Sequence, residues 1–164
     1  MDLSLLKRAV KSFIIVSLFT LFIPVLKDIK IKEKVDRIIQ QKEKSIYKGF
    51  IYIPRFNYKS VIKKDKSALD ENLVEMTNFS DEIGKSNIVL AGHNNKYVFN
   101  KIYYLEKGDE IIISDFKVDY KYIVDKTKYI EVDDYNALNN PDSVTLITCT
   151  NNNQERYIVI AKRE

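Results

Sequence analysis

Two β-branched runs near the C-terminus constrain the fold of this 164-residue chain more than any other feature. Val144–Cys149 and Tyr157–Ala161 have the residue types and the short length of buried strands. A polar loop with three consecutive asparagines separates them, which predicts an antiparallel hairpin. Such a hairpin places Cys149 and Arg156 at or near facing positions, with Cβ atoms roughly 5 Å apart. The sequence therefore predicts a thiol beside a guanidinium at one end of the hairpin.

The rest of the chain from residue 49 onward also has the pattern of a β protein. Further strands are predicted at Gly49–Pro54, Tyr58–Lys63, Asn87–His93, Asp109–Ser114 and Val118–Val132. Short helical segments are predicted at Ser67–Glu75 and Tyr135–Asn140, with a helix or turn at Tyr97–Tyr104. Many short strands at close spacing, with little helix between them, predict a mainly β fold closed into a barrel over residues 49–164.

The N-terminal region has a different character. Ser12–Leu26 carries no charge, and although 15 residues fall short of the ~20 that span a bilayer, the preceding apolar pair extends the run if Lys11 snorkels. A cleaved signal peptide and a buried core helix are the alternatives, but no small-x-small cleavage site follows the run. We therefore predict a cytoplasmic tail and uncleaved transmembrane signal anchor over 1–27. The basic residues before the run favour a cytoplasmic N-terminus, while the lysines that follow it weaken this preference.

Between anchor and barrel, residues 28–48 carry apolar residues at helical spacing without glycine or proline, which predicts an amphipathic stalk helix. The basic excess is confined to this N-terminal part. Residues 1–48 hold 11 basic and 5 acidic residues, whereas 49–164 hold 16 and 18. The predicted barrel therefore has no basic stripe of the kind that binds nucleic acid.

Three side chains of the predicted barrel carry candidate chemistry. Cys149 is the only cysteine, so no disulfide forms within the chain, and His93 is the only histidine, placed at a predicted strand end after Gly92. One histidine and one cysteine do not supply the three or four ligands that zinc needs, so we expect no metal and no cofactor. A lone cysteine is commonly a small buried hydrophobe, and a lone histidine is commonly structural. The other reading is a working thiol, with His93 for proton transfer and Arg156 for a developing oxyanion. The residues alone leave both readings open.

A resemblance to a known family favours the second reading. Thr145-Leu-Ile-Thr-Cys149 matches every fixed position of the TLxTC motif of the sortases, and Leu90-Ala-Gly-His93 and Arg156 follow that family's order. Gly-x-Ile-x-Ile-Pro at 49–54 resembles its first strand. The resemblance covers residues 49–164 together with an N-terminal anchor typical of these transpeptidases of Gram-positive cell surfaces.

The resemblance implies a closed eight-stranded sortase-type β-barrel with short helices. It implies that Cys149 is the nucleophile, His93 the general acid and base, and Arg156 the group that stabilises the substrate or oxyanion. It further implies substrate-binding positions at Thr148, Thr145, Ile147 and Asn94. The partners would be an LPxTG-like sorting signal of a secreted protein and an amine on a peptidoglycan precursor or pilin. The enzyme would be held in the cell membrane by a single-pass anchor, with the catalytic domain outside the cell.

The details point to one part of the family. The loop between Cys149 and Arg156 is only six residues long, without room for the helix-bearing connection of the class B enzymes, and no Asp-Pro-aromatic lid of the class C type precedes the barrel. The motif suits class A or class D. Two alternatives stay open: a related enzyme that assembles pilins or mainly hydrolyses its thioester, and an anchored barrel that binds a peptide without reacting.

Overall fold

The computed structural model describes residues 26–40, 46–151 and 153–164. Residues 26–40 form a helix, and Tyr47 already begins the first strand, two residues before the predicted start of the barrel at Gly49. No helix within the described ranges combines the length and the apolar character that a bilayer crossing requires. Nearly all of the predicted anchor over 1–27 lies outside the described residues.

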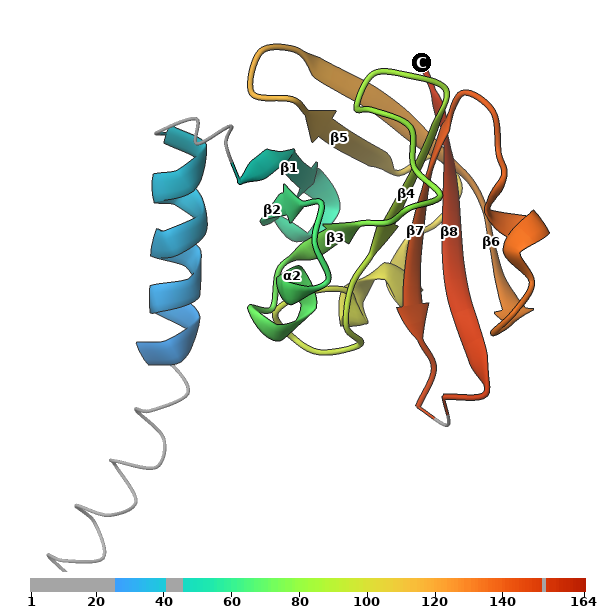
Figure 1. Cartoon of the computed structure of the whole chain (residues 1–164), viewed down its shortest axis with the longest axis horizontal. Helices are drawn as coiled ribbons and strands as arrows, with labels where there is room; N and C mark the ends of the chain where they lie inside the picture. Colours follow the sequence, from blue (N-terminus) through green and yellow to red (C-terminus); the bar gives the residue numbers. More distant parts are fainter. Residues whose placement is uncertain (1–25, 41–45, 152) are drawn as a thin grey trace, which may run out of the picture. The chain divides into compact units, whose positions relative to one another are not determined.

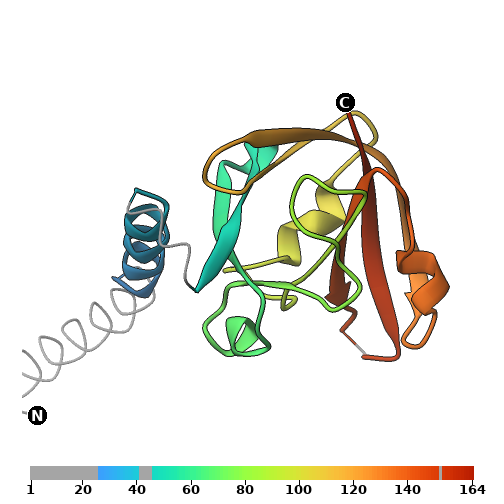
Figure 2. The same cartoon turned by 45° about the horizontal axis from the view of Figure 1, so that its top comes forward.

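Eight strands close into one barrel in the order β1-β2-β3-β4-β7-β8-β6-β5, with β5 returning to pair with β1 (Figures 1 and 2). The strands are β1 (Tyr47–Ile53), β2 (Tyr58–Lys63), β3 (Val74–Met76), β4 (Asn87–Ala91), β5 (Glu110–Ser114), β6 (Asp119–Glu131), β7 (Ser143–Cys149) and β8 (Glu155–Arg163). The helical segments between the strands are short: η1 (Pro54–Phe56), α2 (Ser67–Asp70), η2 (Asn100–Tyr104) and η3 (Tyr135–Leu138). The predicted closed barrel is confirmed.

One strand was not predicted from the sequence. The predicted helix over Ser67–Glu75 ends at Asp70, and Val74 instead begins β3. Val74 pairs with Ile62 of β2 in parallel, and its side chain is fully buried in the barrel core. Burial between distant segments thus overrides the local helical pattern, which carries no information about a partner strand.

Side chains alternate between the barrel interior and its outer surface along each strand. On β7, Val144 and Leu146 belong to the interior core. On β8, Ile158 and Ile160 face outward and pack in a second apolar cluster beneath η3, which lies against the outer side of the sheet (orange in Figures 1 and 2). The barrel therefore has a filled interior and one apolar outer wall, formed by β4, β7, β8 and β6.

A bulge in β6 changes which side chains face that outer wall. Val124 pairs with Ala161 and Lys126 pairs with Ile160, so one residue of β6 is skipped between the two pairs. Because side chains alternate strictly along a strand, one extra residue moves every later side chain to the opposite face. Val124 faces the interior core before the bulge, whereas Ile130 belongs to the outer cluster after it.

Candidate active site

The hairpin brings Cys149 and Arg156 to facing positions, as predicted. Cys149 and Arg156 are the last facing pair of β7 and β8 before the connecting loop. Cys149 is a free, half-buried cysteine. Nη1 of Arg156 donates to the carbonyl oxygens of Asn153 at 3.3 Å and Glu155 at 3.1 Å, which holds the guanidinium at the hairpin end. Within the described ranges, no carboxylate forms an ion pair with the Arg156 side chain.

The histidine reaches the same edge of the barrel because β4 and β7 are parallel. Ala91 pairs with Ile147, so both strands end at one edge. Gly92 is bonded to β7 twice: its N–H donates to the carbonyl of Ile147 at 3.1 Å, and its carbonyl accepts from Oγ1 of Thr148 at 2.8 Å. His93 follows directly and has an exposed side chain. The strand order thus brings together two residues that lie 56 positions apart.

Gly92 is required at this position for steric reasons. A Cβ atom built there would lie 2.6 Å from both the Phe99 ring and a Val98 methyl group, closer than real Cβ contacts allow. Both of those side chains are buried in the core, so neither has room to move away. The absence of a side chain lets the segment before His93 lie flat on the core.

One cavity of about 300 Å³ contains all three candidate side chains on its wall, Cys149, His93 and Arg156. The remaining wall is mainly apolar and comes from several elements, with Leu69, Phe79, Val89, Ala91, Ile130, Val132, Tyr135, Leu138 and Ile147. Phe79 and Tyr135 stack at one side of the cavity with ring centroids 5.2 Å apart. Among the described residues, no side-chain hydrogen bond links Cys149, His93 and Arg156. In enzymes without substrate such contacts are often long and tighten on binding.

Tyr103 supports the main chain of Cys149, and the sequence analysis did not single out this residue. Its hydroxyl donates to the main-chain carbonyl of Cys149 at 3.1 Å. Its ring stacks on Tyr157 with centroids 4.4 Å apart, and Tyr129 meets Tyr157 edge-on at 5.1 Å. Burial, together with the nearby Tyr129, Cys149 and Tyr157, raises the pKa of Tyr103, so its hydroxyl stays protonated as a donor. No local pattern could reveal this residue, because its partner lies 46 positions away.

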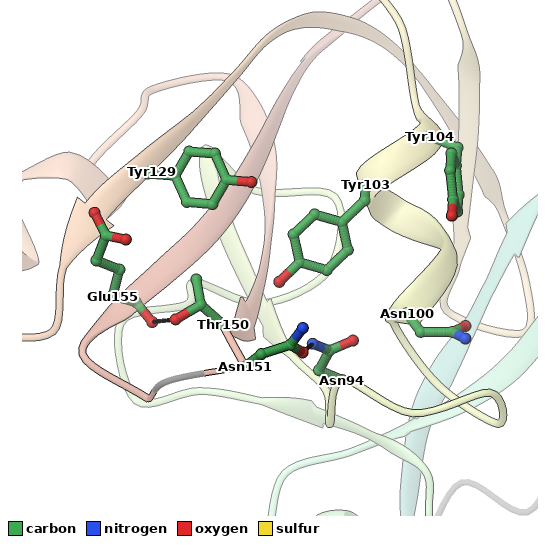
Figure 3. A pocket seen from close by; sticks show the side chains of 8 residues that line it. All are labelled: Asn94, Asn100, Tyr103, Tyr104, Tyr129, Thr150, Asn151 and Glu155. Carbon is green, nitrogen blue, oxygen red and sulfur yellow. Dashed lines mark hydrogen bonds between the residues drawn. The ribbon is translucent and has the colours of Figure 1, made fainter.

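The predicted substrate-binding positions divide into two groups. Ile147 and Thr148 line the cavity, although the Thr148 hydroxyl is bonded to Gly92 and therefore positions the segment before His93. Thr145 is fully buried and its Oγ1 accepts from the Asn140 amide at 3.3 Å, so it lies away from the cavity. Asn94 also lies outside this cavity, where its amide donates to Oδ1 of Asn151 at 3.1 Å (Figure 3). Thr148 and Ile147 face opposite sides of β7, whereas Thr145 is on the same face as Ile147 but two residues further from the strand end that carries Cys149.

Fold and site together define a class: closed, mixed eight-stranded β-barrels in which a cysteine, a histidine and an arginine meet at one cavity. The chain belongs to the sortase family, since the model of the Sortase domain matches residues 51–164. The resemblance inferred from the motifs is confirmed.

Individual relatives agree with this assignment. The chain is 34% identical over 104 residues to sortase A of Bacillus anthracis, a match covering 57% of this chain and 50% of that protein. It is 28% identical over 130 residues to sortase A of Listeria monocytogenes, covering 74% and 59%. The chain thus spans about half to three-fifths of the lengths of these curated relatives.

Solved structures show the same barrel. Listeria monocytogenes sortase A superposes with a TM-score of 0.66 at 25% identity, covering 73% of this chain and 88% of that one. The sortase D5 transpeptidase of Clostridium perfringens superposes with a TM-score of 0.65 at 26% identity, covering 82% and 94%.

Proposed function

We propose that this chain is a cysteine transpeptidase that cleaves an LPxTG-like sorting signal through a thioester and transfers the new carboxyl end to an amine. The observation that carries the proposal is the cavity that holds Cys149, His93 and Arg156 on one wall. A nucleophile, a proton-transfer group and a cation are the three parts that acyl transfer by a thiol requires. Membership of the sortase family supports the same chemistry.

The acylation step follows from these positions. Sγ of Cys149 attacks the carbonyl carbon after the threonine of the signal, and the carbonyl oxygen becomes an oxyanion as the C–S bond forms. Arg156 donates N–H groups to that oxyanion, a role that its planar fork suits. His93 protonates the leaving amine as the C–N bond breaks.

The apolar wall of the cavity suits the first residues of such a signal. Val89, Ala91 and Ile147 line it from β4 and β7, and Ile130 and Leu138 line it from β6 and η3. Fully burying a leucine side chain against such a wall contributes roughly 1.5–3 kcal/mol. We propose that the leucine and proline of the signal bind there, and that the backbone after them extends toward Cys149.

The second half of the reaction releases the product. An amine attacks the thioester carbon, His93 accepts the proton from the amine nitrogen, and the thiolate of Cys149 leaves. The acceptor would be an amine on a peptidoglycan precursor or on a pilin. We further propose that residues 1–27 anchor the enzyme in the cell membrane with the N-terminus in the cytoplasm and the barrel outside. Protease added to intact cells should then digest the barrel but not the N-terminal tail.

Mass spectrometry of the full chain tests the enzymatic proposal. The chain is incubated with a panel of LPxTG-like peptides, with and without glycinamide. We expect a thioester adduct on Cys149 and a new amide product that contains glycinamide. Cys149→Ala should form neither, while its Tm stays close to that of the parent. His93→Gln, which keeps the fold because the side chain is exposed, should slow adduct formation strongly.

Each alternative outcome has its own signature. A thioester that yields only free acid with every amine indicates a mainly hydrolytic enzyme. A folded parent that binds a peptide but forms no adduct, and whose Cys149 resists iodoacetamide, indicates the non-catalytic barrel and refutes the proposal.

A further inference from the structure

The main chain on both sides of His93 is fastened by hydrogen bonds. Before His93, the carbonyl of Gly92 accepts from Oγ1 of Thr148 on β7. After His93, the chain turns back on itself, and the carbonyl of His93 accepts from the N–H groups of Asn95 at 2.9 Å and Phe99 at 3.0 Å. The imidazole is exposed, so the main chain that carries it determines where it lies.

Asn95 is the centre of the turn that follows His93. Its Oδ1 accepts from the N–H of Tyr97 at 2.8 Å, and its main-chain carbonyl accepts from the N–H groups of Val98 and Asn100, each at 3.2 Å. Its Nδ2 points out of the turn and donates to Oδ1 of Asn72 at 2.9 Å. Both asparagines are half-buried, so this bond is partly shielded from water. It joins the turn to a segment that lies 23 positions earlier in the chain.

The segment that carries Asn72 is anchored independently of this bond. Nζ of Lys63, on β2, donates to Oγ of Ser67 at 2.7 Å and forms an ion pair with Oε1 of Glu71 at 2.8 Å. These contacts fasten α2 and the residue that follows it to β2. Leu73, directly after Asn72, is buried. Asn72 therefore offers Asn95 an acceptor at a fixed position.

The backbone of Asn72 shows that a turn alone does not require its side chain. Its φ is 56°, in the left-handed region that glycine adopts most readily and asparagine tolerates. Glycine would serve the turn equally well, but it lacks the oxygen that the Asn95 amide uses. Asparagine and aspartate are the residues that combine a left-handed backbone with a short side-chain acceptor.

We propose that Asn72 is a positioning residue for His93: through Asn95 it fixes the turn that follows the imidazole, as Thr148 fixes the residue that precedes it. The inference rests on the proposed function, because the place of the imidazole affects the rate only if His93 transfers a proton. Asn72 does not line the cavity that holds Cys149, so it acts through Asn95 and not by touching the sorting signal.

Single-turnover acylation of the full chain by a saturating LPxTG-like peptide tests the inference, with each variant measured at its optimal pH. Asn72→Gly keeps the left-handed backbone and removes the acceptor. Because a misplacement of about 1 Å at a catalytic group can cost on the order of 100-fold, we expect a fall of about ten-fold for a turn that is loosened and not lost. Asn72→Asp keeps an oxygen in place and should restore most of the rate. The affinity for the peptide, measured in a Cys149→Ala background, should not change in Asn72→Gly.

Breaking the same bond from its other end checks that Asn72 acts through Asn95. Asn95→Asp keeps Oδ1 for the Tyr97 N–H but removes the Nδ2 donor. It should slow acylation as Asn72→Gly does. The double variant should be no slower than either single variant, because residues that act through one bond are not additive. Rate losses that multiply in the double variant would refute the pathway through Asn95.

Asn57→Gly is the matched control. Asn57 follows η1 and also has a left-handed backbone, with a φ of 46°. Its side chain is exposed and, within the described part of the chain, forms no hydrogen bond. The exchange is thus chemically the same as Asn72→Gly but breaks no bond to the turn after His93, and acylation should keep the parent's rate. An equal fall in both glycine variants, or a parent-like rate in Asn72→Gly, overturns the inference.

A measurement on the imidazole separates this inference from the proposed function. His93 is the only histidine, so the Cε1–Hε1 NMR signal of chain labelled with isotopic histidine reports on it alone, without peptide. The signal should broaden in Asn72→Gly and stay parent-like in Asn57→Gly. If the parent forms no thioester but the signal follows this pattern, the proposed function fails while positioning by Asn72 stands. If the parent forms a thioester but neither the signal nor the rate changes in Asn72→Gly, the positioning role is refuted alone.

Discussion

The hydrogen bond from Thr148 to Gly92 gives the sharpest prediction about how the fold positions His93. Oγ1 of Thr148 is buried and donates to the Gly92 carbonyl at 2.8 Å. Thr148→Val keeps the shape of the side chain but removes the donor. A lost buried hydrogen bond whose acceptor stays in place costs about 1–3 kcal/mol. Urea unfolding of the full chain should therefore show a free energy of unfolding that is lower by about 1–2 kcal/mol. Each kcal/mol corresponds to a fall of roughly 2–4 °C in Tm.

The same variant should also slow the chemistry, beyond its effect on stability. Without the bond, the Gly92 carbonyl next to His93 loses its contact with β7, while the Gly92 N–H and the pairing of Ala91 with Ile147 remain, so the imidazole is held less firmly at the cavity that Cys149 lines. A misplacement of about 1 Å at a catalytic group can cost on the order of 100-fold in rate. We expect adduct formation with an LPxTG-like peptide to fall by at least ten-fold in Thr148→Val and to recover in Thr148→Ser.

Thr145→Val is the control for this prediction. Thr145 lies on the same strand, is equally buried, and has a hydroxyl bonded to Asn140, away from His93. It should lose a similar amount of stability with little loss of rate. Equal rate losses in the Thr145 and Thr148 variants, or a parent-like rate in Thr148→Val, would refute the positioning role.

Three further predictions concern other parts of the barrel. Arg156→Lys should lower the rate of adduct formation by about 100-fold or more, because a single ammonium cannot reproduce the planar fork at the oxyanion, and a parent-like rate would exclude that role. Gly92→Ala should destabilise the fold by about 1–3 kcal/mol in urea unfolding, because the new methyl group would overlap Phe99 and Val98; unchanged stability would contradict the steric argument. Tyr122→Phe should stabilise by about 1 kcal/mol, since within the described residues the buried Tyr122 hydroxyl has no hydrogen-bond partner. Burial raises the pKa of Tyr122. The free energy of unfolding of the parent should therefore fall as the pH rises above about 10 towards the folded-state pKa, and that of Tyr122→Phe should fall less.

The parts of this structure that the sequence predicts are those set by neighbouring residues. The pairing of Cys149 with Arg156 follows from one short loop between two β-branched runs, and the hairpin has that register. The position of His93 depends on parallel pairing between β4 and β7, which local pattern cannot specify; the motif resemblance supplied it instead. The three-residue strand β3 and the support of Cys149 by Tyr103 depend on partners far along the chain, and neither was predicted.

The alternation of side chains explains why the motif residues of β7 do different things. Thr148 faces the side of the sheet opposite Ile147 and Cys149; all three line the cavity, but the Thr148 hydroxyl is bonded to Gly92 and fixes the segment before His93. Arg156 reaches the same wall only because it faces Cys149, and Ile130 reaches it only because β6 contains a bulge after Val124. Without that extra residue, Tyr129 would face the cavity that Cys149 lines, and Ile130 would face the barrel interior. The stack of Tyr157 with Tyr103 and Tyr129, which supports Cys149, would then lose its edge ring. The bulge therefore determines the surroundings of Cys149 on both faces of the sheet: it places Ile130 in the apolar wall of the cavity, and it places Tyr129 against Tyr157 on the other face.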